Sequence, residues 1–386
     1  MRIYIVARGY PTKRFKTNGI FEFDQAIALK KRGHEVVFLV LDLRSIRRKR
    51  KWGNESKKVE GIFIEALNLP LGRIPNKWLY ILGEIGLKKL YKRCVHKYGK
   101  PDVIHSHFAD ISYITNMALS KEKSVKVITE HASVIHNDLV KNSDKIRYKR
   151  AYHMADEVIA VSSSLASVMF NEYQIKCKVI PNIVNITELG IKNTFTLAQN
   201  SKTKYTFVSV GRLTKEKGMI HLVESFVSCF NMDEDVQLII VGDGVEKKCL
   251  EEIIRRNKRE KQIILLGTKS RCEIAGILCK SDCFVLPSES ETFGVVYAEA
   301  MVFGIPVIGT RCGGPEDFID SESGILVDVN DESELKEALL FMKANSNKLY
   351  NKEIIKNRIK NICSEEIIGA QLENLYKELL EKRSLS

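Results

Sequence analysis

Two carboxylates with a fixed spacing stand in a glycine-containing part of the chain. Glu291 lies in the segment Glu289–Val295, and Glu299 follows within a run of apolar residues at helical spacing. The segment presents free backbone N–H groups at a helix N-terminus, a position that favours phosphate. Carboxylates there would repel a bare phosphate, but they accept hydrogen bonds from sugar hydroxyls. The pattern therefore favours a ligand that joins phosphate to sugar, such as a nucleotide sugar.

The elements that must position these carboxylates form a strand, a loop, a helix and a second strand. The apolar run Cys283–Leu286 ends at a proline and predicts a buried strand. Gly294 opens the helix, Gly304 closes it, and Val307–Gly309 predicts the next strand. This alternation is typical of a doubly wound α/β sheet.

A second loop carries cations where the first carries carboxylates. A predicted strand, Phe207–Val210, runs into Gly211-Arg212 and Lys217-Gly218, and a helical pattern follows. Arginine binds phosphate oxygens bidentately, lysine supplies a point charge, and the helix N-terminus adds its dipole. We therefore predict that Arg212 and Lys217 bind a diphosphate. The flanking glycines disfavour the alternative, an exposed basic loop.

The order of these motifs resembles that of the retaining glycosyltransferases of group 1, also called family 4. The motifs are Glu291-x7-Glu299, Gly304-x-Pro306, Gly313-Gly314-Pro315-Glu316, Asp282–Ser288, Gly211-Arg212-x4-Lys217-Gly218, Gly242-Asp243-Gly244, Gly33-His34-Glu35-Val36 and Pro181-Asn182. Together they cover essentially the whole chain. The resemblance implies the GT-B fold, in which two Rossmann-like doubly wound domains face each other across a cleft.

The resemblance also implies roles for individual residues. The implied catalytic residues are His131, Glu291, Arg212 and Lys217. The implied donor-binding residues are Gly19, Arg212, Lys217, Glu291, Phe293, Gly294, Val295 and Glu299. In the family, the histidine contacts the transferred sugar, Glu291 would hold its hydroxyls, and Glu299 would hold the ribose. The family's first loop has paired glycines where this chain has Asn18-Gly19, so only the role of Gly19 carries over.

The implied reaction moves a sugar from a nucleoside diphosphate sugar to a glycan or glycolipid acceptor, with retention, in surface polysaccharide synthesis. Two alternatives are a sugar-nucleotide epimerase on the same fold and a non-catalytic nucleotide-sugar-binding protein. The Glu291-x7-Glu299 spacing favours transfer, and the presence of Arg212 and Lys217 argues against binding alone. We expect no metal, because no Asp-x-Asp pair or His/Asp cluster follows a strand. We expect no cofactor, and the nucleoside diphosphate sugar is the donor substrate.

Length and charge divide the chain. A chain of 386 residues suits two domains. We expect an acceptor-side domain at 1–184, a polar linker at Asn185–Tyr205, a nucleotide-sugar domain at 204–363, and a helix at 364–386 that in the family crosses back to the first domain. Residues 1–190 hold 34 Lys and Arg against 18 Asp and Glu, a balance of +16, whereas the remainder holds 27 against 30, a balance of −3. The basic half indicates an anionic partner.

Two histidines follow predicted strands of the first domain. His107 comes shortly after the predicted strand 101–105, and His131 after Val125–Thr129. Ligands of parallel sheets bind at the carboxyl ends of strands, although either side chain could equally be a hydrogen-bonded structural histidine. His131 matches the family's histidine, and we leave His107 out of the predicted site. The first strand lacks G-x-G-x-x-G, so no dinucleotide site is indicated.

Two segments bear on localisation. Arg44–Lys58 is a basic run with Trp52 inside it, predicted to be a surface loop, and no motif there indicates nucleic acid. Lys77–Tyr98 predicts a helix that either buries its apolar positions in the domain or lies on an anionic membrane. Those positions are Trp78, Ile81, Leu82 and Ile85, against Lys88, Lys89, Lys92 and Arg93. With no spanning apolar stretch and nine scattered cysteines, we expect a cytoplasmic protein, either peripheral on the inner membrane face or soluble with a solvated basic face. The donor base, sugar, acceptor, linkage and oligomeric state stay open.

Overall fold

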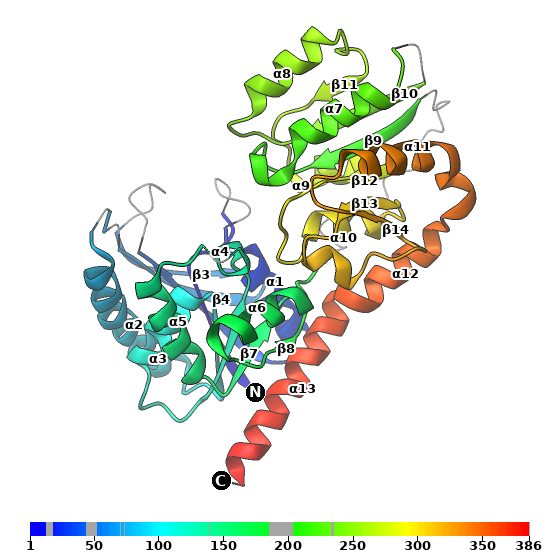
Figure 1. Cartoon of the computed structure of the whole chain (residues 1–386). Coiled ribbons are helices and arrows are strands. Elements are labelled where there is room, and N and C mark those ends of the chain that lie inside the picture. Colours follow the sequence, from blue (N-terminus) through cyan, green and yellow to red (C-terminus); the bar gives the residue numbers. More distant parts are fainter. Residues whose placement is uncertain are drawn as a thin grey trace. The chain divides into compact units, whose positions relative to one another are not determined.

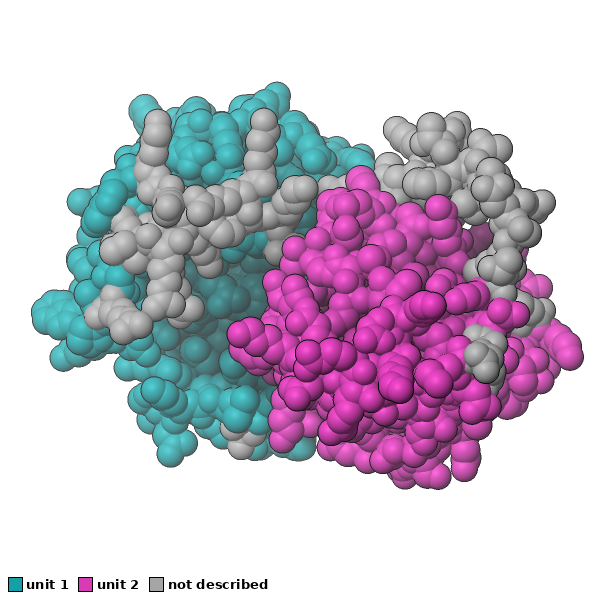
Figure 2. All heavy atoms as spheres, turned by 90° about the horizontal axis from the view of Figure 1, so that it is seen from above, with its two compact units in different colours: residues 1–183, 365–386 teal, residues 184–364 magenta. Residues whose placement is uncertain are grey.

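The computed structural model describes residues 1–12, 18–43, 52–69, 71–72, 74–137, 139–184, 204–232 and 235–385. The chain divides into two compact units, coloured separately in Figure 2. The first comprises Met1–Ile183 with Glu365–Ser386, and the second comprises Val184–Ser364. Of the predicted linker, residues 185–203 lie outside the described part of the chain.

The first unit is built on a sheet with eight strands among the described residues (Figure 1). In spatial order they are β3 (Gly53–Val59), β4 (Ile62–Asn68), β2 (Glu35–Asp42), β1 (Arg2–Ala7), β5 (Val103–His107), β6 (Val125–Glu130), β7 (Glu157–Ala160) and β8 (Lys178–Val179). Neighbouring strands are parallel, except that β3 runs antiparallel to β4. Strand order reverses at β1, which lies between β2 and β5, and ligands of such sheets bind at this switch point.

Helices cover both faces of this sheet. They are α1 (Ile20–Lys31), α2 (Asn76–Tyr98), α3 (Ala109–Ala118), α4 (Ser133–His136), α5 (Asn142–His153), α6 (Ser163–Tyr173) and α13 (Glu365–Ser384). One hydrophobic core joins the sheet to α1 and α13, and another joins it to α2 and α3. Helix α13, red in Figure 1, lies beside α1, where Glu373 pairs with Arg32 and Glu365 pairs with Lys31. The final helix of the chain is therefore part of the first unit.

The burial of α2 corrects one of the two interpretations of residues 77–98. A Cβ on Gly83 would lie 2.9 Å from a methyl of Ile114, and one on Gly86 would lie 2.9 Å from a methyl of Leu67. These glycines let the helix approach α3 and the sheet closely, so they define its buried side together with residues such as Leu87. The outward side exposes Trp78, Ile81, Leu82 and Ile85. The interpretation of α2 as a domain helix with a buried face is therefore right about the helix, but wrong about these four side chains, which lie outside that face.

The basic run Arg44–Lys58 is in part a strand. Residues 44–51 lie outside the described part, and Trp52 is exposed. From Gly53 onward the chain forms β3, where the predicted loop is wrong. The cause is the free edge of β4: Ser56 pairs in register with Glu65 and donates a hydrogen bond to its carboxylate.

The second unit has an all-parallel sheet of six strands within the described residues. In spatial order they are β11 (Ile263–Leu265), β10 (Val236–Val241), β9 (Tyr205–Val210), β12 (Cys283–Val285), β13 (Val307–Thr310) and β14 (Gly324–Val327). Its helices are η2 (Lys215–Lys217), α7 (Met219–Cys229), α8 (Lys247–Arg256), α9 (Arg271–Leu278), α10 (Val295–Val302), η3 (Gly314–Asp317), α11 (Glu332–Leu349) and α12 (Lys352–Cys363). Here the order reverses at β9, between β10 and β12. The strands predicted around both candidate loops are confirmed, and those loops follow β9 and β12.

Candidate active site

The loops after β9 and β12 bring a cation and a carboxylate together. Lys217 Nζ lies 2.6 Å from Glu291 Oε1, and the Ser288 hydroxyl donates to the same oxygen at 2.9 Å. The side chains of Lys217 and Glu291 are only 16% and 11% exposed, so the pair is largely shielded from solvent. The backbone joins the two loops as well, because the Glu289 N–H donates to the carbonyl of Glu216 at 2.8 Å.

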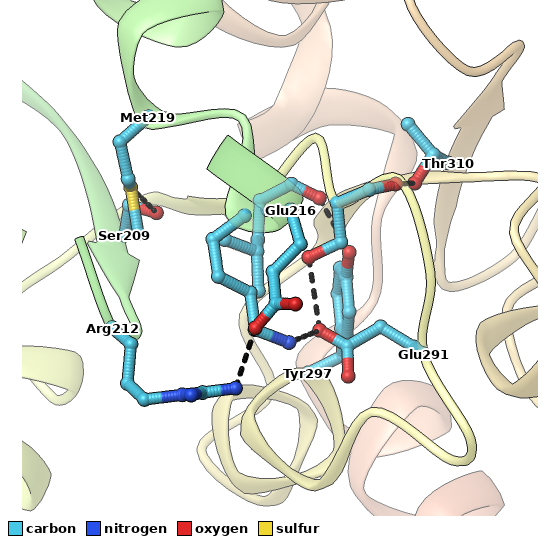
Figure 3. Close-up of polar contacts among 10 residues, drawn as sticks. Ser209, Arg212, Glu216, Met219, Glu291, Tyr297 and Thr310 are labelled. Carbon is cyan, nitrogen blue, oxygen red and sulfur yellow. Dashed lines mark hydrogen bonds and ion pairs between the residues drawn. The ribbon is translucent and has the colours of Figure 1, made fainter. Parts of the chain in front are cut away.

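Gly218 permits this close approach. It begins α7 in the left-handed conformation, with φ 64°, and a Cβ there would lie 2.1 Å from the Pro287 carbonyl oxygen. Any larger residue would force the loops apart. Two hydrogen bonds hold the loop after β12 in place. Tyr297 donates to the carbonyl of Leu286, and Thr310 donates to the carbonyl of Ser288 (Figure 3).

Arg212 extends the cationic side of the site. Its guanidinium lies 2.5 Å from Glu216 Oε1, and its side chain is 70% exposed (Figure 3). Arg212 and Lys217 therefore each have a carboxylate partner, Glu216 and Glu291 respectively. A diphosphate that binds these cations competes with the carboxylates for the same N–H donors.

Three further predicted donor-binding residues, Phe293, Gly294 and Val295, lie at the N-terminus of α10. Gly294 precedes the helix with φ 86°, and the first N–H groups, beginning with Val295, have no intrahelical acceptor. Phe293 is buried against Phe318 with ring centroids 5.1 Å apart, which fixes the loop in place. This arrangement suits an anion at the helix end.

Glu299 lies further along α10 and is largely buried. Burial raises the pKa of Glu299, and the positive charge of Arg271 opposes that rise. The Arg271 guanidinium, at the start of α9, lies 3.8 Å from the Glu299 carboxylate. Sequence reasoning missed Arg271, although its place at the start of the helix that follows β11 was a usable signal.

In the first unit, His131 belongs to a hydrogen-bonded chain. Its Nδ1 lies 2.9 Å from Asn182 Oδ1, and its Nε2 lies 3.0 Å from His107 Nδ1. Because an amide oxygen only accepts, neutral His131 donates from Nδ1 and its Nε2 accepts from His107. His107 is the last residue of β5, which extends two residues beyond the predicted end of that strand. Sequence reasoning did not place His107 in the site.

Burial keeps these imidazoles uncharged. It lowers the pKa of His131 to about 3, outweighing its hydrogen bond to Asn182, and it lowers that of His107 well below the usual value. His105 stacks on His107 at 4.4 Å between ring centroids, and burial lowers its pKa to about 3. Its Nδ1 lies 2.6 Å from the hydroxyl of Tyr376, a residue of α13. The chain of hydrogen-bonded and stacked groups thus runs from α13 to His131.

Glu130 fixes the backbone around His131. Its carboxylate accepts hydrogen bonds from the N–H groups of Ala109 at 2.8 Å, His131 at 2.9 Å and Ala132 at 2.8 Å. The hydroxyl of Tyr152 donates a further one at 2.9 Å. Burial raises the pKa of Glu130, and these hydrogen bonds oppose that rise. Sequence reasoning gave Glu130 no role, although a carboxylate at the end of a buried strand was visible.

The first unit contains a cavity of about 420 Å³. Gly19 lines it at the start of α1, with φ 69°, where a Cβ would lie 2.3 Å from the Gly9 carbonyl oxygen. Phe21 and Phe108 line it too, and both lie against the His131 ring, with centroids 5.9 and 5.0 Å away. Gly19 therefore lines the cavity, whereas His131 packs against two of its aromatic lining residues and is not itself a lining residue.

Within the described ranges, no group of three or more His, Cys, Asp or Glu side chains is arranged to hold a metal ion. In the same part of the chain, no helix has the length and apolar character needed to cross a bilayer.

Known proteins match both halves of the chain. Residues 193–361 match the family described as Glycosyl transferases group 1, and residues 23–188 match Glycosyltransferase Family 4. An uncharacterised glycosyltransferase of Methanocaldococcus jannaschii is 32% identical over 283 residues, which cover 72% of this chain and 75% of the relative. Alpha-monoglucosyldiacylglycerol synthase of Acholeplasma laidlawii is 25% identical over 352 residues, which cover 83% and 85%.

A solved structure shows the fold. The Anabaena protein Alr3699/HepE, crystallised in complex with UDP, has a TM-score of 0.73 at 18% identity, covering 98% of this chain and 99% of that chain. The predicted GT-B fold, an α/β architecture with two parallel-sheet units, is confirmed.

Proposed function

Because the chain belongs to the group 1, or family 4, glycosyltransferases, we propose that it moves a sugar from a nucleoside diphosphate sugar to a glycan or glycolipid, with retention at the anomeric carbon. One observation carries the proposal: a cation suited to the diphosphate, Lys217, and a carboxylate suited to sugar hydroxyls, Glu291, lie 2.6 Å apart beside a helix N-terminus. The UDP complex of the Anabaena neighbour and the glucosylated lipid named for the Acholeplasma relative support these donor and acceptor classes.

The proposed step exchanges one bond at the anomeric carbon. The bond to the diphosphate oxygen breaks, and its electron pair leaves with the diphosphate. The acceptor oxygen bonds to the same face of the carbon, and its proton passes to the departing diphosphate. Lys217, Arg212 and the N–H groups at Gly294 and Val295 stabilise the leaving charge, and a preorganised donor of this kind contributes about 3–4 kcal/mol.

The other predicted residues have supporting roles in this proposal. Gly19 offers backbone N–H to the phosphate, and Glu299 accepts hydrogen bonds from the ribose hydroxyls. His131 contacts the transferred sugar as a neutral imidazole, since burial lowers its pKa to about 3. No protein side chain acts as a nucleophile.

Product analysis tests the chemistry. With an α-configured donor we expect an α-linked product, and the anomeric proton coupling in the NMR spectrum of the product would show it. A β-linked product would overturn retention. Incubation with donor alone tests the alternative, because an epimerase would convert the sugar nucleotide without any acceptor.

We also propose that the reaction needs no metal ion, because Lys217 and Arg212 can neutralise the diphosphate that a divalent cation would otherwise bridge. Turnover should persist in EDTA. Loss of turnover in EDTA with recovery on adding magnesium or manganese would contradict this part of the proposal.

We propose further that the first unit rests on the inner face of an anionic membrane, in the synthesis of a surface polysaccharide or glycolipid. Helix α2 exposes Trp78, Ile81, Leu82 and Ile85. The neighbouring Lys77, Lys88, Lys89 and Lys92 are exposed as well. Each lysine near an anionic leaflet contributes about 1 kcal/mol, and the apolar side chains add burial in the interface.

Vesicle sedimentation tests the membrane proposal. Binding should be stronger to anionic than to neutral vesicles, should fall with salt, and should weaken in Trp78→Ser/Ile85→Ser. The matched control is Leu349→Ser, which alters an exposed apolar residue of the second unit. Equal binding of the two vesicle types, or no binding to either, would remove the proposal.

A further inference from the structure

The hydrogen-bonded chain that includes His131 contains one polar atom without a partner. His107 is fully buried, and among the described residues its Nε2 has no hydrogen-bond partner. Its other ring nitrogen, Nδ1, lies 3.0 Å from His131 Nε2. Each neutral imidazole carries a single N–H, so the open end at His107 Nε2 bears on how the protons of the whole chain are arranged.

Two arrangements of the protons fit these contacts. In the first, His107 donates from Nδ1 to His131 Nε2, and His131 donates from Nδ1 to Asn182 Oδ1. In the second, both hydrogen bonds are reversed and His107 carries its proton on Nε2. The second arrangement would bury an N–H without an acceptor, which is rarer in folded proteins than an unpaired acceptor. It would also need the amide nitrogen of Asn182 where the structure has the oxygen, 2.9 Å from His131 Nδ1. The first arrangement therefore describes the chain.

The ring of His107 is itself held in place. His105 stacks on it with ring centroids 4.4 Å apart and an angle of 25° between the ring planes. Both nitrogens of His105 are engaged, one with the hydroxyl of Thr129 at 2.7 Å and one with that of Tyr376 at 2.6 Å. A ring fixed by packing and by such neighbours presents its N–H in a single direction. His107 is therefore a preorganised donor towards His131.

The main chain of His131 has little freedom either, because the Glu130 carboxylate accepts from the N–H groups of His131 and Ala132. What is left to be fixed is the orientation of the ring. A turn of 180° about its Cβ–Cγ bond would exchange nitrogens for carbons and would break the hydrogen bonds to Asn182 and His107 together. The partner of one ring nitrogen sets the protonation of the other. These two bonds therefore select one ring orientation and one tautomer of His131.

We propose that His107 is a positioning residue for the proposed sugar transfer: through its Nδ1–H it holds the His131 ring in the orientation and tautomer that the transferred sugar meets. The inference rests on the proposed transferase function, in which His131 contacts that sugar. Because both ring nitrogens of His131 are engaged, the ring offers the sugar its C–H groups and faces, and it neither gives nor takes a proton during the transfer. His107 acts only through His131.

Nitrogen-15 NMR of the wild-type protein with labelled histidine tests the proton arrangement without any ligand. Long-range ¹H–¹⁵N spectra distinguish a protonated ring nitrogen from one that carries a lone pair. The variants His107→Asn and His131→Asn assign the signals of the two rings by their loss. At neutral pH we expect the proton of each ring on Nδ1. A proton on Nε2 of His131 would overturn the inference, whether or not any variant folds.

Two substitutions separate hydrogen-bond donation from packing. His107→Asn keeps an N–H donor near the position of Nδ1 but loses the ring, whereas His107→Phe keeps a ring and loses the donor. Turnover should fall about tenfold in His107→Phe and less than about threefold in His107→Asn. The ¹⁵N signal of His131 Nε2 should move in the first variant and stay near its wild-type position in the second. His153→Asn, at an exposed position of the same unit, should behave as wild type.

Turnover is measured as slow hydrolysis of the donor, in which water takes the place of the acceptor. The probes are UDP-glucose, UDP-N-acetylglucosamine and GDP-mannose, and the released nucleotide is quantified. The loss in His107→Phe should appear in kcat, while KM for the hydrolysed donor should change less than about twofold, because we expect the second unit to bind the nucleotide. A role in packing alone predicts the opposite order of the two variants, since Phe fills the space of the imidazole better than Asn.

Two results of these assays would overturn the inference: wild-type turnover in His107→Phe, or a greater loss of turnover in His107→Asn than in His107→Phe. Failure of the proposed function gives a different result. If the wild type hydrolysed none of the three donors and neither UDP nor GDP raised its Tm, the transferase proposal would fail, and the inference with it. If a nucleotide raised the Tm of wild type and both variants alike while turnover failed to follow the donor, the positioning role alone would be wrong.

Discussion

The two units place polar groups at the same edge of similar sheets, but they stabilise those groups by opposite means. In the first unit, His105, His107 and His131 are buried, and burial lowers each pKa so that the rings stay neutral. In the second, Lys217 and Arg212 keep carboxylate partners and part of their exposure. Neutral groups with hydrogen-bond partners tolerate full burial, whereas charges must be paired or solvated. We therefore expect the hydrogen bonds of the histidines in the first unit to stay in place when a ligand binds. In the second unit, we expect Lys217 and Arg212 to exchange their carboxylate partners for the ligand.

The largest effect is expected at Lys217. Lys217→Ala should lower kcat/KM by about 10²–10³-fold, because a preorganised charge on the leaving diphosphate is lost. It should also lower Tm, since Glu291 is left largely buried without its cation. Steady-state kinetics and thermal unfolding measure the two effects.

A double variant separates the loss of activity from the loss of thermal stability. Lys217→Met/Glu291→Gln removes both charges, so Tm should recover towards wild type while activity stays low. If Tm fell further in the double variant, the pair would not be the stabilising unit that the distance of 2.6 Å indicates.

The next effect is expected at Arg212. Arg212→Ala should lower kcat/KM by about 10²-fold through loss of charge-assisted bonds to the diphosphate. Because the side chain is 70% exposed and pairs with Glu216 near solvent, Tm should barely change. Wild-type kinetics in this variant would remove Arg212 from the donor site.

The site of the first unit and the site of the second also differ in how far the sequence could predict them. The strand-loop-helix pattern around Glu291 and Arg212 is local, so spacing and glycines sufficed to predict the loops of the second unit. The pairing of Lys217 with Glu291 depends on β9 and β12 being neighbours in the sheet, which local spacing does not reveal. The His107–His131 contact likewise arises because β5 and β6 run side by side.

Surface exposure was the least predictable property. The apolar side chains of α2, such as Trp78, follow a helical period that fits either a buried or an exposed face. The glycines at 83 and 86 decide the question, because their contacts to Ile114 and Leu67 exist only in the folded unit. Strand β3 was missed for a similar reason: its polar sequence pairs with an edge strand that the local pattern does not show.

The pH dependence of stability tests the neutral histidines. The unfolded pKa is about 6.5 and the folded values for His105 and His131 are about 3, so the unfolded state binds more protons between these limits. The free energy of unfolding should therefore fall as pH drops below 6.5, by about 2 kcal/mol per histidine at pH 5. Urea unfolding at pH 5 and 7.5 measures this.

Substitutions of single histidines show which residues cause the pH dependence of the free energy of unfolding. His105→Asn and His131→Asn should each reduce the difference in stability between pH 7.5 and pH 5, even if both lower stability overall. The exposed His153, in the same unit, provides the matched control His153→Asn, which should keep the wild-type difference. An unchanged difference in the first two variants would show that these rings are not held neutral.

The smallest effect is expected at Tyr376. Tyr376→Phe removes the hydroxyl that lies 2.6 Å from His105 Nδ1 and should lower the free energy of unfolding by about 1 kcal/mol. Turnover should change less than twofold, because His131 keeps its bonds to Asn182 and His107. A large loss of turnover with unchanged stability would show that Tyr376 helps to position His131 through His105 and His107.

The packing of α13 on the first unit sets an order of events during synthesis. Residues 1–183 leave the ribosome first, but their core includes Ile368, Leu372 and Tyr376 and is incomplete until α13 emerges. At about 5–20 residues per second, the nascent first unit waits roughly 10–40 s while the second unit is translated. During that interval the second unit, continuous in sequence, is free to fold. The first unit, although made earlier, is the last to be completed.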